Sequence, residues 1–224
     1  MASLLITNEN YLQKVVTKKS GGIGRTKNVL SVSTRLFIVT HGGNMFTIAG
    51  IGSRDTPKNI LKEMKTIGEW CRINGVTVRS GHADGADWAF ESGAQDLCVA
   101  YIPWNGFNSH FISDASIVIP EYTKELVELA EQFHPAWEKL THGAKKLIAR
   151  DGLQVLGSDL KTPVNMVVCW TKGGKAVGGT GQAIRIAEAN RIPVANMFGH
   201  MFDSSDKVIR EIEAFKNSAI VMGQ

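Results

Sequence analysis

Short apolar segments alternate with amphipathic segments from Phe46 onward, and this alternation constrains the fold more than any other feature of the sequence. Segments of strand length lie at 46–50, 76–80, 97–102, 116–119, 165–171 and 194–196. Apolar residues at helical spacing run from Thr56 to a stop at Asn74-Gly75 and occupy 84–95, 123–133, 181–190 and 204–215. Strands and helices that alternate in this way are typical of βαβ units. The sequence therefore predicts an α/β fold with a mostly parallel sheet.

The segment 134–162 fits this alternation least well. Apolar residues at helical spacing, from Trp137 to Ile148, are followed by a stretch that Gly and Asp residues interrupt. We therefore treat the segment as an insert before the strand at 165–171.

The positive charge of the chain is confined to its first part. The formal net charge is +4, yet residues 1–45 hold six basic residues and one acidic residue, whereas the remainder holds 19 basic and 20 acidic residues. We interpret 1–45 as a basic N-terminal extension and 46–224 as the main domain. The Gly-rich basic stretch at 18–27 is either an arm that contacts phosphates, including those of a nucleic acid, or a solvated loop.

Several classes of protein are disfavoured by what the sequence lacks. No run approaches the roughly 20 apolar residues of a membrane helix, and the N-terminus has no basic leader before its apolar patch, so we expect a cytoplasmic protein with no membrane partner. Cys71, Cys98 and Cys169 are scattered and the histidines are dispersed, so we expect neither a disulfide framework nor a metal site. We also expect no resident cofactor.

Three loops rich in small residues follow predicted strands. They are Gly-Ile-Gly-Ser-Arg-Asp at 50–55, Ser-Gly-His-Ala-Asp-Gly-Ala-Asp at 80–87, and the stretch from Thr171 to Gln182. In an open α/β sheet, ligands bind outside the carboxyl ends of the strands, where helix N-termini present free N–H groups to anions. Each loop alone could serve a turn or a flexible connection, but together they predict a phosphate or nucleotide site.

Two nucleotide-binding classes are nevertheless disfavoured. Asp55 stands where the third glycine of the dinucleotide fingerprint would fall, and no Gly-x-x-x-x-Gly-Lys-Ser/Thr occurs in the chain. We therefore expect neither an NAD dehydrogenase nor a P-loop ATPase.

The predicted ligand contacts come from the three loops and from one arginine of the insert. Arg54 is placed to bind a phosphate through two N–H groups, although an ion pair with Asp55 or Glu63 is its alternative role. The expected nucleotide-binding residues are Gly50, Gly52, Ser53, Arg54, Ser80, Gly81, Asp84, Gly85, Ala86, Arg150, Thr171, Gly178, Gly179, Thr180, Gly181 and Gln182.

The three loops resemble those of a known superfamily. Ile-Ala-Gly-Ile-Gly-Ser-Arg at 48–54, Ser-Gly-His-Ala-Asp-Gly-Ala-Asp at 80–87 and Gly-Gly-Thr-Gly-Gln-Ala-Ile-Arg-Ile-Ala at 178–187 are similar to the ligand-facing loops of the SLOG superfamily. That group includes the DNA-processing protein A (DprA) family, the Lonely Guy phosphoribohydrolases formerly labelled lysine decarboxylases, and Rossmann-like proteins often found in phages. The resemblance spans about 46–198. It implies a Rossmann-like fold with helices on both faces of the sheet, a nucleotide-derived ligand and often a homo-oligomer.

The third loop departs from the Lonely Guy motif Pro-Gly-Gly-x-Gly-Thr-x-x-Glu. Val177, Gln182 and Arg185 stand where that family has Pro, Thr and the catalytic Glu. The resemblance therefore does not carry cytokinin-type phosphoribohydrolase activity over to this chain.

Other carboxylates could still cleave an N-glycosidic bond, because that reaction needs a negative charge near the sugar and an acid for the leaving base. Asp84, Asp87 and Glu91 are spaced to lie along one face of the helix after the second loop, and we predict Asp87 and Glu91 as the catalytic pair. Their alternative roles are an N-cap, a partner of the helix dipole and a solvated surface residue, respectively.

Three functions remain open at this stage. The leading hypothesis is a protein that binds a nucleotide or nucleotide-derived small molecule, with hydrolysis of an N-glycosidic bond as its chemistry if it is an enzyme. The second is a non-enzymatic sensor or sequestering protein for a nucleotide signal. The third is a DprA-like mediator of recombination that binds single-stranded DNA and uses the basic residues of 1–45.

Overall fold

A twisted parallel sheet forms the centre of the part of the chain that the structure describes. This structure is a computed structural model, and it describes residues 46–108 and 116–222. The strands are β1 (Thr47–Gly50), β2 (Thr77–Ser80), β3 (Cys98–Tyr101), β4 (Ser116–Val118), β5 (Met166–Cys169) and β6 (Val194–Asn196). Within these residues they form one six-stranded sheet of order β4-β3-β2-β1-β5-β6, and every pair is parallel. The predicted α/β class is confirmed.

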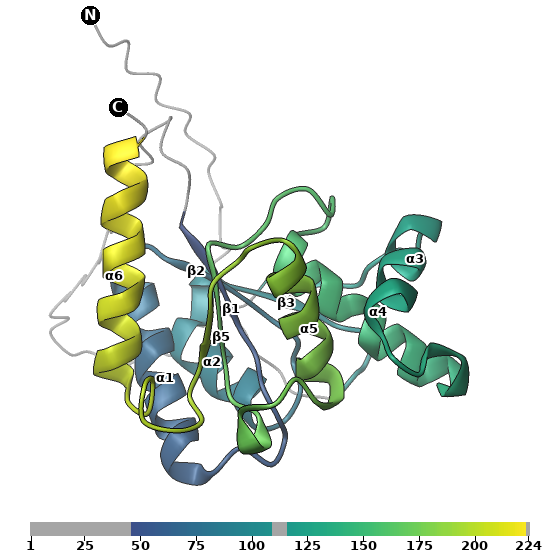
Figure 1. The fold of residues 1–224 in the computed structure, drawn as a ribbon, viewed down its shortest axis with the longest axis horizontal. Coiled ribbons are helices and arrows are strands. Elements are labelled where there is room, and N and C mark those ends of the chain that lie inside the picture. The colour runs from purple at the N-terminus through teal and green to yellow at the C-terminus, as the bar shows by residue number, and fades with distance from the viewer. Residues whose placement is uncertain (1–45, 109–115, 223–224) are drawn as a thin grey trace, which may run out of the picture. The chain divides into compact units, whose positions relative to one another are not determined.

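Helices cover both faces of this sheet (Figure 1). One face carries α1 (Lys58–Ile73), α2 (Ala86–Ala94) and α6 (Ser205–Met222), and the other carries α3 (Lys124–Phe133), α4 (His142–Leu156) and α5 (Gly178–Ala189). Short 3₁₀ turns lie at Gln95–Leu97, Trp137–Lys139 and Lys172–Gly174. The arrangement is the Rossmann-like one that the resemblance implied.

The order of the strands reverses beside β1. The chain runs outward from β1 through β2 and β3 to β4, and then crosses back to place β5 on the other side of β1. The loops that follow β1 and β5 therefore leave the sheet next to each other and turn toward opposite faces. Such a switch point leaves a crevice at the carboxyl ends of the two strands.

Side-chain alternation along β1 explains how the sheet is held between its helices. Ile48 packs into the apolar core shared with α1, α2 and α6, whereas the next residue, Ala49, packs into the core shared with α4 and α5. Both side chains are fully buried. Strands that are covered on both faces in this way are apolar at consecutive positions, as the sequence showed.

Three helix starts differ from the sequence prediction. The first helix begins at Lys58 after Pro57, and Thr56 donates its hydroxyl to Ser53 O instead of capping the helix. The helix predicted over 84–95 begins at Ala86, because the preceding residue, Gly85, has a φ of 83° and so cannot belong to a right-handed helix. The helix predicted over 181–190 begins at Gly178, three residues early, and this shift brings its N-terminus into the crevice.

The insert at 134–162 contains α4, whose N-terminus is capped by the Thr141 side chain. Every residue of this helix from Ile148 to Leu156 is buried, including three polar ones. The described residues contain no helix that is both long and apolar enough to cross a membrane.

Candidate functional site

A cavity of about 680 Å³ lies where the loops after β1 and β5 leave the sheet. Its walls come from these two loops, from the first residues of α5 and from α4. Ala83 in the loop after β2 and Asp87 in the first turn of α2 also line it. We call it the switch-point cleft. The predicted residues that line it are Gly52, Ser53, Arg54, Asp87, Arg150, Thr171, Gly178, Gly179 and Thr180.

Close backbone packing forms the β1 side of the cleft. A Cβ on Gly52 would lie 2.6 Å from the Cβ of Ala86, so a larger residue would push the first loop away from α2. Gly85, with its positive φ, allows the second loop to approach within van der Waals contact of the Arg54 backbone. The small residues thus bring two loops together and leave Ser53 and Arg54 facing the cleft.

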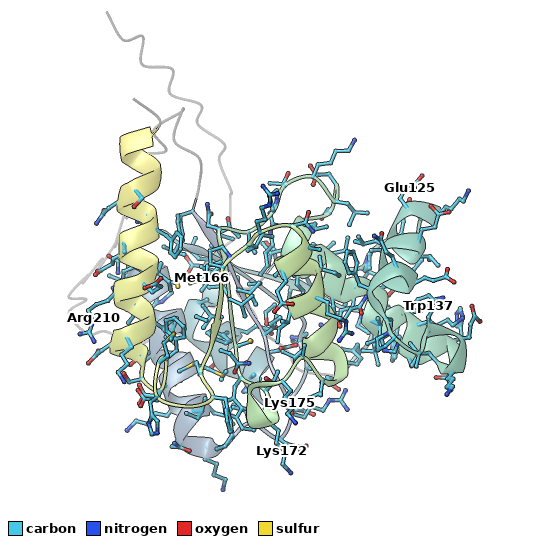
Figure 2. The ribbon with its side chains drawn as sticks, viewed as in Figure 1. Glu125, Trp137, Met166, Lys172, Lys175 and Arg210 are labelled. Carbon is cyan, nitrogen blue, oxygen red and sulfur yellow. The ribbon has the colours of Figure 1, made fainter. Side chains whose placement is uncertain are left out.

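The N-terminus of α5 forms the opposite wall. Gly178, Gly179 and Thr180 are the first residues of this helix and they line the cleft, where the first N–H groups of a helix have no partner within the helix. Lys172 lines the cleft from the preceding loop, and Figure 2 shows Lys172 and Lys175 projecting outward from that loop. Helix dipole and lysine charge together favour an anion at this wall.

The floor of the cleft is a buried cluster of two carboxyl groups and one guanidinium. Arg150 Nη1 lies 3.7 Å from Asp87 Oδ2, and Arg150 Nε lies 3.7 Å from Asp151 Oδ1. Each of the three side chains is less than a tenth exposed. Both distances exceed ordinary hydrogen-bond length, so the charges attract without being directly bonded.

Two residues that do not line the cleft, Tyr101 and Phe107, contact the guanidinium of Arg150. Its Nη1 donates to the Tyr101 carbonyl at 3.3 Å, and its guanidinium lies 5.8 Å from the ring centre of Phe107. A Cβ at Gly81 would collide with the guanidinium and with the Gln154 amide, which explains why a glycine stands there. The buried Nε of Arg150 has no hydrogen-bond partner among residues 46–108 and 116–222.

Burial raises the pKa of both carboxyl groups of the floor. The pKa of Asp87 rises to about 6, because the desolvation of its buried carboxylate outweighs the opposing effect of Arg150 and of hydrogen bonds from the Ala83 and Gly52 backbones. Desolvation also raises the pKa of Asp151, to about 8. The positive charge of Arg150 opposes this rise, and the negative charge of Asp87 adds to it. Burial thus favours the protonated form of both carboxyl groups, and it does so more strongly for Asp151 than for Asp87.

Glu91 does not reach the cleft, in contrast to its predicted catalytic role. It is fully buried on α2, its Oε1 accepts the backbone N–H of His82 at 2.7 Å, and its Oε2 lies 2.8 Å from His82 Nδ1. His82 has a φ of 57°, a left-handed conformation that is unfavourable for a residue with a Cβ. Glu91 thus stabilises the second loop in a strained shape.

Asp84 also differs from its prediction. It precedes α2 and is exposed, so the acidic face of three residues expected along that helix does not form. Asp87 does occupy the first turn of α2, and in addition it faces the cleft.

Other predicted ligand contacts lie behind the walls of the cleft and support them. Ser80 donates its hydroxyl to Gly50 O at 2.8 Å, which joins the ends of β2 and β1. Gln182 is fully buried and donates to Ala130 O at 2.8 Å while it accepts from Arg185. The remaining members of this supporting set are Gly50, Gly81, Gly85, Ala86 and Gly181.

The structure adds residues that were absent from the predicted site. Asp151 and Gln154 come from α4, Lys172 comes from the loop after β5, and His134 follows α3. Asp151 and Gln154 share the apolar stretch 148–156 with Arg150, and polar residues within an apolar helical stretch were the available signal.

The fold and the cleft define a Rossmann-like protein with a cavity of about 680 Å³ at the switch point of its sheet. Comparison with known proteins supports this class through structure alone. No protein-family model matches the chain, and no curated protein matches it.

Solved structures with a similar fold include DprA from Helicobacter pylori, with a TM-score of 0.51 and 15% identity over 79% of this chain and 80% of that one. DprA from Streptococcus pneumoniae has a TM-score of 0.44 and 19% identity, with 76% of this chain and 56% of that one covered. The molybdenum cofactor carrier protein from Chlamydomonas reinhardtii has a TM-score of 0.46 and 12% identity, with 77% and 98% covered. The expected DprA-like Rossmann fold is confirmed, whereas the phage affiliation stays a prediction.

Proposed function

We propose that this chain binds a nucleotide or nucleotide-derived small molecule in the switch-point cleft. The observation that carries the proposal is the meeting of the α5 N-terminus, Arg54 and the buried Asp87–Arg150–Asp151 floor around one cavity. A volume of about 680 Å³ lies within the roughly 300–1,000 Å³ of small-molecule sites.

The phosphate of the ligand belongs at the α5 wall. Gly178 and Gly179 carry no side chains that would cover the free N–H groups of the helix, and Arg54 and Lys172 add positive charge on either side of them. Arg54 is exposed and can fork onto two phosphate oxygens. The sugar and base then lie toward α4, where Leu147 and Ile148 supply apolar surface.

The chemistry that we assign to the cleft is hydrolysis of an N-glycosidic bond. The transition state of that reaction carries positive charge on the sugar, and Asp87 is a cleft-lining carboxylate that can balance this charge.

A nucleotide sensor or sequestering protein is the second candidate, and the third loop favours it. Arg185 replaces the family's catalytic Glu and donates hydrogen bonds to the carbonyls of Phe133 and Ala176, a structural role. A sensor would bind the same ligand and release it unchanged.

Binding of single-stranded DNA is the third candidate. The structure of Helicobacter pylori DprA is described as showing a single-stranded DNA binding mode. The basic residues of 1–45 lie outside the described residues, and their six positive charges would favour the phosphates of such DNA. DNA binding would weaken steeply with salt and would fall when 1–45 is deleted.

Calorimetric titration of the full chain with AMP, GMP, CMP and UMP tests the binding proposal. We expect at least one of them to bind, and Arg54→Ala to weaken that binding about tenfold, because a charge-assisted phosphate contact contributes about 1.5–3 kcal/mol. Arg210→Ala is the matched control, since Arg210 is exposed on α6 away from the cleft (Figure 2). Failure of all four nucleotides to bind, or equal losses in the two variants, would contradict the proposal.

A further inference from the structure

We propose that Asp151 is the general acid of the switch-point cleft, paired with Asp87 across Arg150, and that the two carboxyl groups hydrolyse the N-glycosidic bond of a nucleoside monophosphate. This inference rests on the proposed function, and it replaces the pair Asp87 and Glu91 predicted from the sequence.

The position of Asp151 is the first argument. Its side chain lines the cleft, and its Oδ2 lies 3.4 Å from where a Cβ on Gly179 would stand. The carboxyl group is therefore beside the α5 N-terminus, within the same cavity that would hold the phosphorylated sugar. A general acid must lie within hydrogen-bond reach of the substrate, and Asp151 is the carboxyl group that α4 contributes to the lining of the cleft.

The guanidinium between the two carboxyl groups is the second argument. Arg150 Nε is buried and has no hydrogen-bond partner, although both carboxyl groups lie 3.7 Å from the guanidinium. A buried donor without a partner is destabilising, so it marks a place where the hydrogen bonding of the protein alone is incomplete. Arg150 thus lies between Asp87 and Asp151 without a close hydrogen bond to either, so both carboxyl groups remain available at the floor of the cleft.

The charged groups around Asp151 determine which carboxyl group holds a proton. Arg150 faces it from α4 and Asp87 from α2, while Arg54, Lys172 and His134 line the cleft beyond them. Asp87 has two backbone N–H donors, from Ala83 and Gly52, that stabilise its ionised form. Burial raises the pKa of Asp151 with no hydrogen bond among the opposing causes, so we assign the proton of the floor to Asp151.

The reaction follows from these two states. Asp151 donates its proton to the leaving base as the bond between C1′ and the base nitrogen breaks, and the bonding electron pair leaves with the base. The ionised Asp87 balances the positive charge that develops on the sugar. Water then adds its oxygen to C1′ and gives its proton to Asp87, and this proton returns to Asp151, the group with the higher pKa. The products are the free base and the sugar phosphate.

Glu91 cannot replace either group in this scheme. Both of its oxygens are engaged by His82, at 2.7 and 2.8 Å, and the residue is fully buried outside the lining of the cleft. Its hydrogen bonds shape the loop on which Ala83 lies, which makes it a positioning residue.

The test measures binding and turnover separately for the full-length wild type, Asp151→Asn and Asp87→Asn. AMP, GMP, CMP and UMP are the probes, calorimetry gives the dissociation constant, and chromatography gives the release of free base. Asp96→Asn is the matched control, because Asp96 is exposed in the short turn before β3 and lies outside the cleft lining. Thermal melting of each variant checks that it is folded.

We expect the wild type to release base from a nucleotide that it binds, and Asp151→Asn to lower kcat about 10²- to 10⁴-fold while the dissociation constant changes less than threefold. The alkaline limb of the pH profile of kcat should have an apparent pKa of about 8 in the wild type. This limb should disappear in Asp151→Asn. Asp96→Asn should match the wild type.

Each other outcome decides between the two proposals. Binding without release of base by the wild type would overturn the inference and leave the binding function intact, as would full turnover by a folded Asp151→Asn. Absence of binding by every probe would instead overturn the proposed function itself. A loss of kcat in Asp151→Asn with an unchanged alkaline limb would overturn the assignment of Asp151 as the acid.

Discussion

Two buried acid–base clusters each include one carboxyl group of α2, Glu91 in the first and Asp87 in the second, and they are built in opposite ways. In the first, Glu91 and His82 are joined at 2.7 and 2.8 Å, with both carboxyl oxygens engaged. In the second, Arg150 stands 3.7 Å from each of its two aspartates and keeps a buried N–H without a partner. Only the second cluster lines the cleft.

The difference separates a structural role from a ligand-binding one. A buried polar cluster whose hydrogen bonds are complete stabilises the fold and has nothing left for a ligand. A cluster with long contacts and an unpaired donor at a cavity is incomplete until a ligand or water joins it. Burial of charge therefore does not by itself mark a site, whereas incomplete pairing beside a cavity does.

Removing Glu91 gives the largest expected effect on stability. Glu91→Ala removes the carboxylate that binds both the backbone N–H and the ring of His82, and it releases a loop with a left-handed residue, so we expect a loss of about 3–5 kcal/mol in the free energy of unfolding. Asp151→Ala at pH 7 should cost about 1 kcal/mol or less, since its contacts are long. Urea denaturation measures both. Equal losses in the two variants would remove the proposed distinction between the clusters.

The dependence of stability on pH gives the next largest effect. The folded pKa of Asp151, about 8, lies above its ordinary value of 3.8, so between these values the folded state binds more protons than the unfolded state. Stability attributable to this group therefore falls as pH rises through that window, and it stays low above pH 8. Asp87 contributes with the same sign only up to about pH 6. Between pH 6 and 8, the difference in slope between the wild type and Asp151→Asn therefore reports on Asp151.

In that range we expect the wild type to lose up to about 1 kcal/mol of unfolding free energy per pH unit through Asp151. Asp151→Asn should show a flatter profile and should exceed the wild type in stability at pH 8. Asp96→Asn should keep the wild-type slope. A slope that is identical in all three proteins would mean that Asp151 titrates normally.

The fold and the rim of the cleft were predictable from the sequence, because both depend on local patterns. Apolar segments of strand length, such as 165–171, gave the sheet, and glycine in loops such as that at Gly52 marked where the backbone is close-packed. The start of α5 was placed three residues late, since Gly178 and Gly179 are poor helix formers and only their position in the fold makes them helical.

Asp87 and Arg150 of the floor were among the predicted site residues, whereas Asp151 and the pairing of the two aspartates were not predicted, because the floor joins residues far apart in the chain. Asp87 and Asp151 are 64 positions apart, and helical spacing alone paired Asp87 with Glu91, which is its neighbour on α2. Tertiary packing determines whether a carboxyl group on a helix contacts a histidine, as Glu91 does, or lines a cavity, as Asp87 does. Sequence spacing carries no information about that choice.

The smallest expected effect is a dependence of anion affinity on the protonation of Asp151. An anion at the α5 N-terminus would stand beside Asp151, and its negative charge would raise the pKa of that carboxyl group further. By linkage, the anion then binds more tightly when Asp151 is protonated. Inorganic sulfate is the suitable probe, because it does not itself titrate between pH 7 and 9.

We expect the sulfate affinity of the wild type, followed through the shift in melting temperature, to fall about threefold to tenfold from pH 7 to pH 9. His134 and Asp87 line the same cleft, but the pKa of the first lies below its ordinary 6.5 and that of the second is about 6, so both change little over this range. Asp151→Asn should bind sulfate with nearly the same affinity at both values. If that variant retains the wild-type decrease, the coupled proton resides elsewhere, and the cleft binds anions through its helix N-terminus and arginines without a titrating carboxyl group.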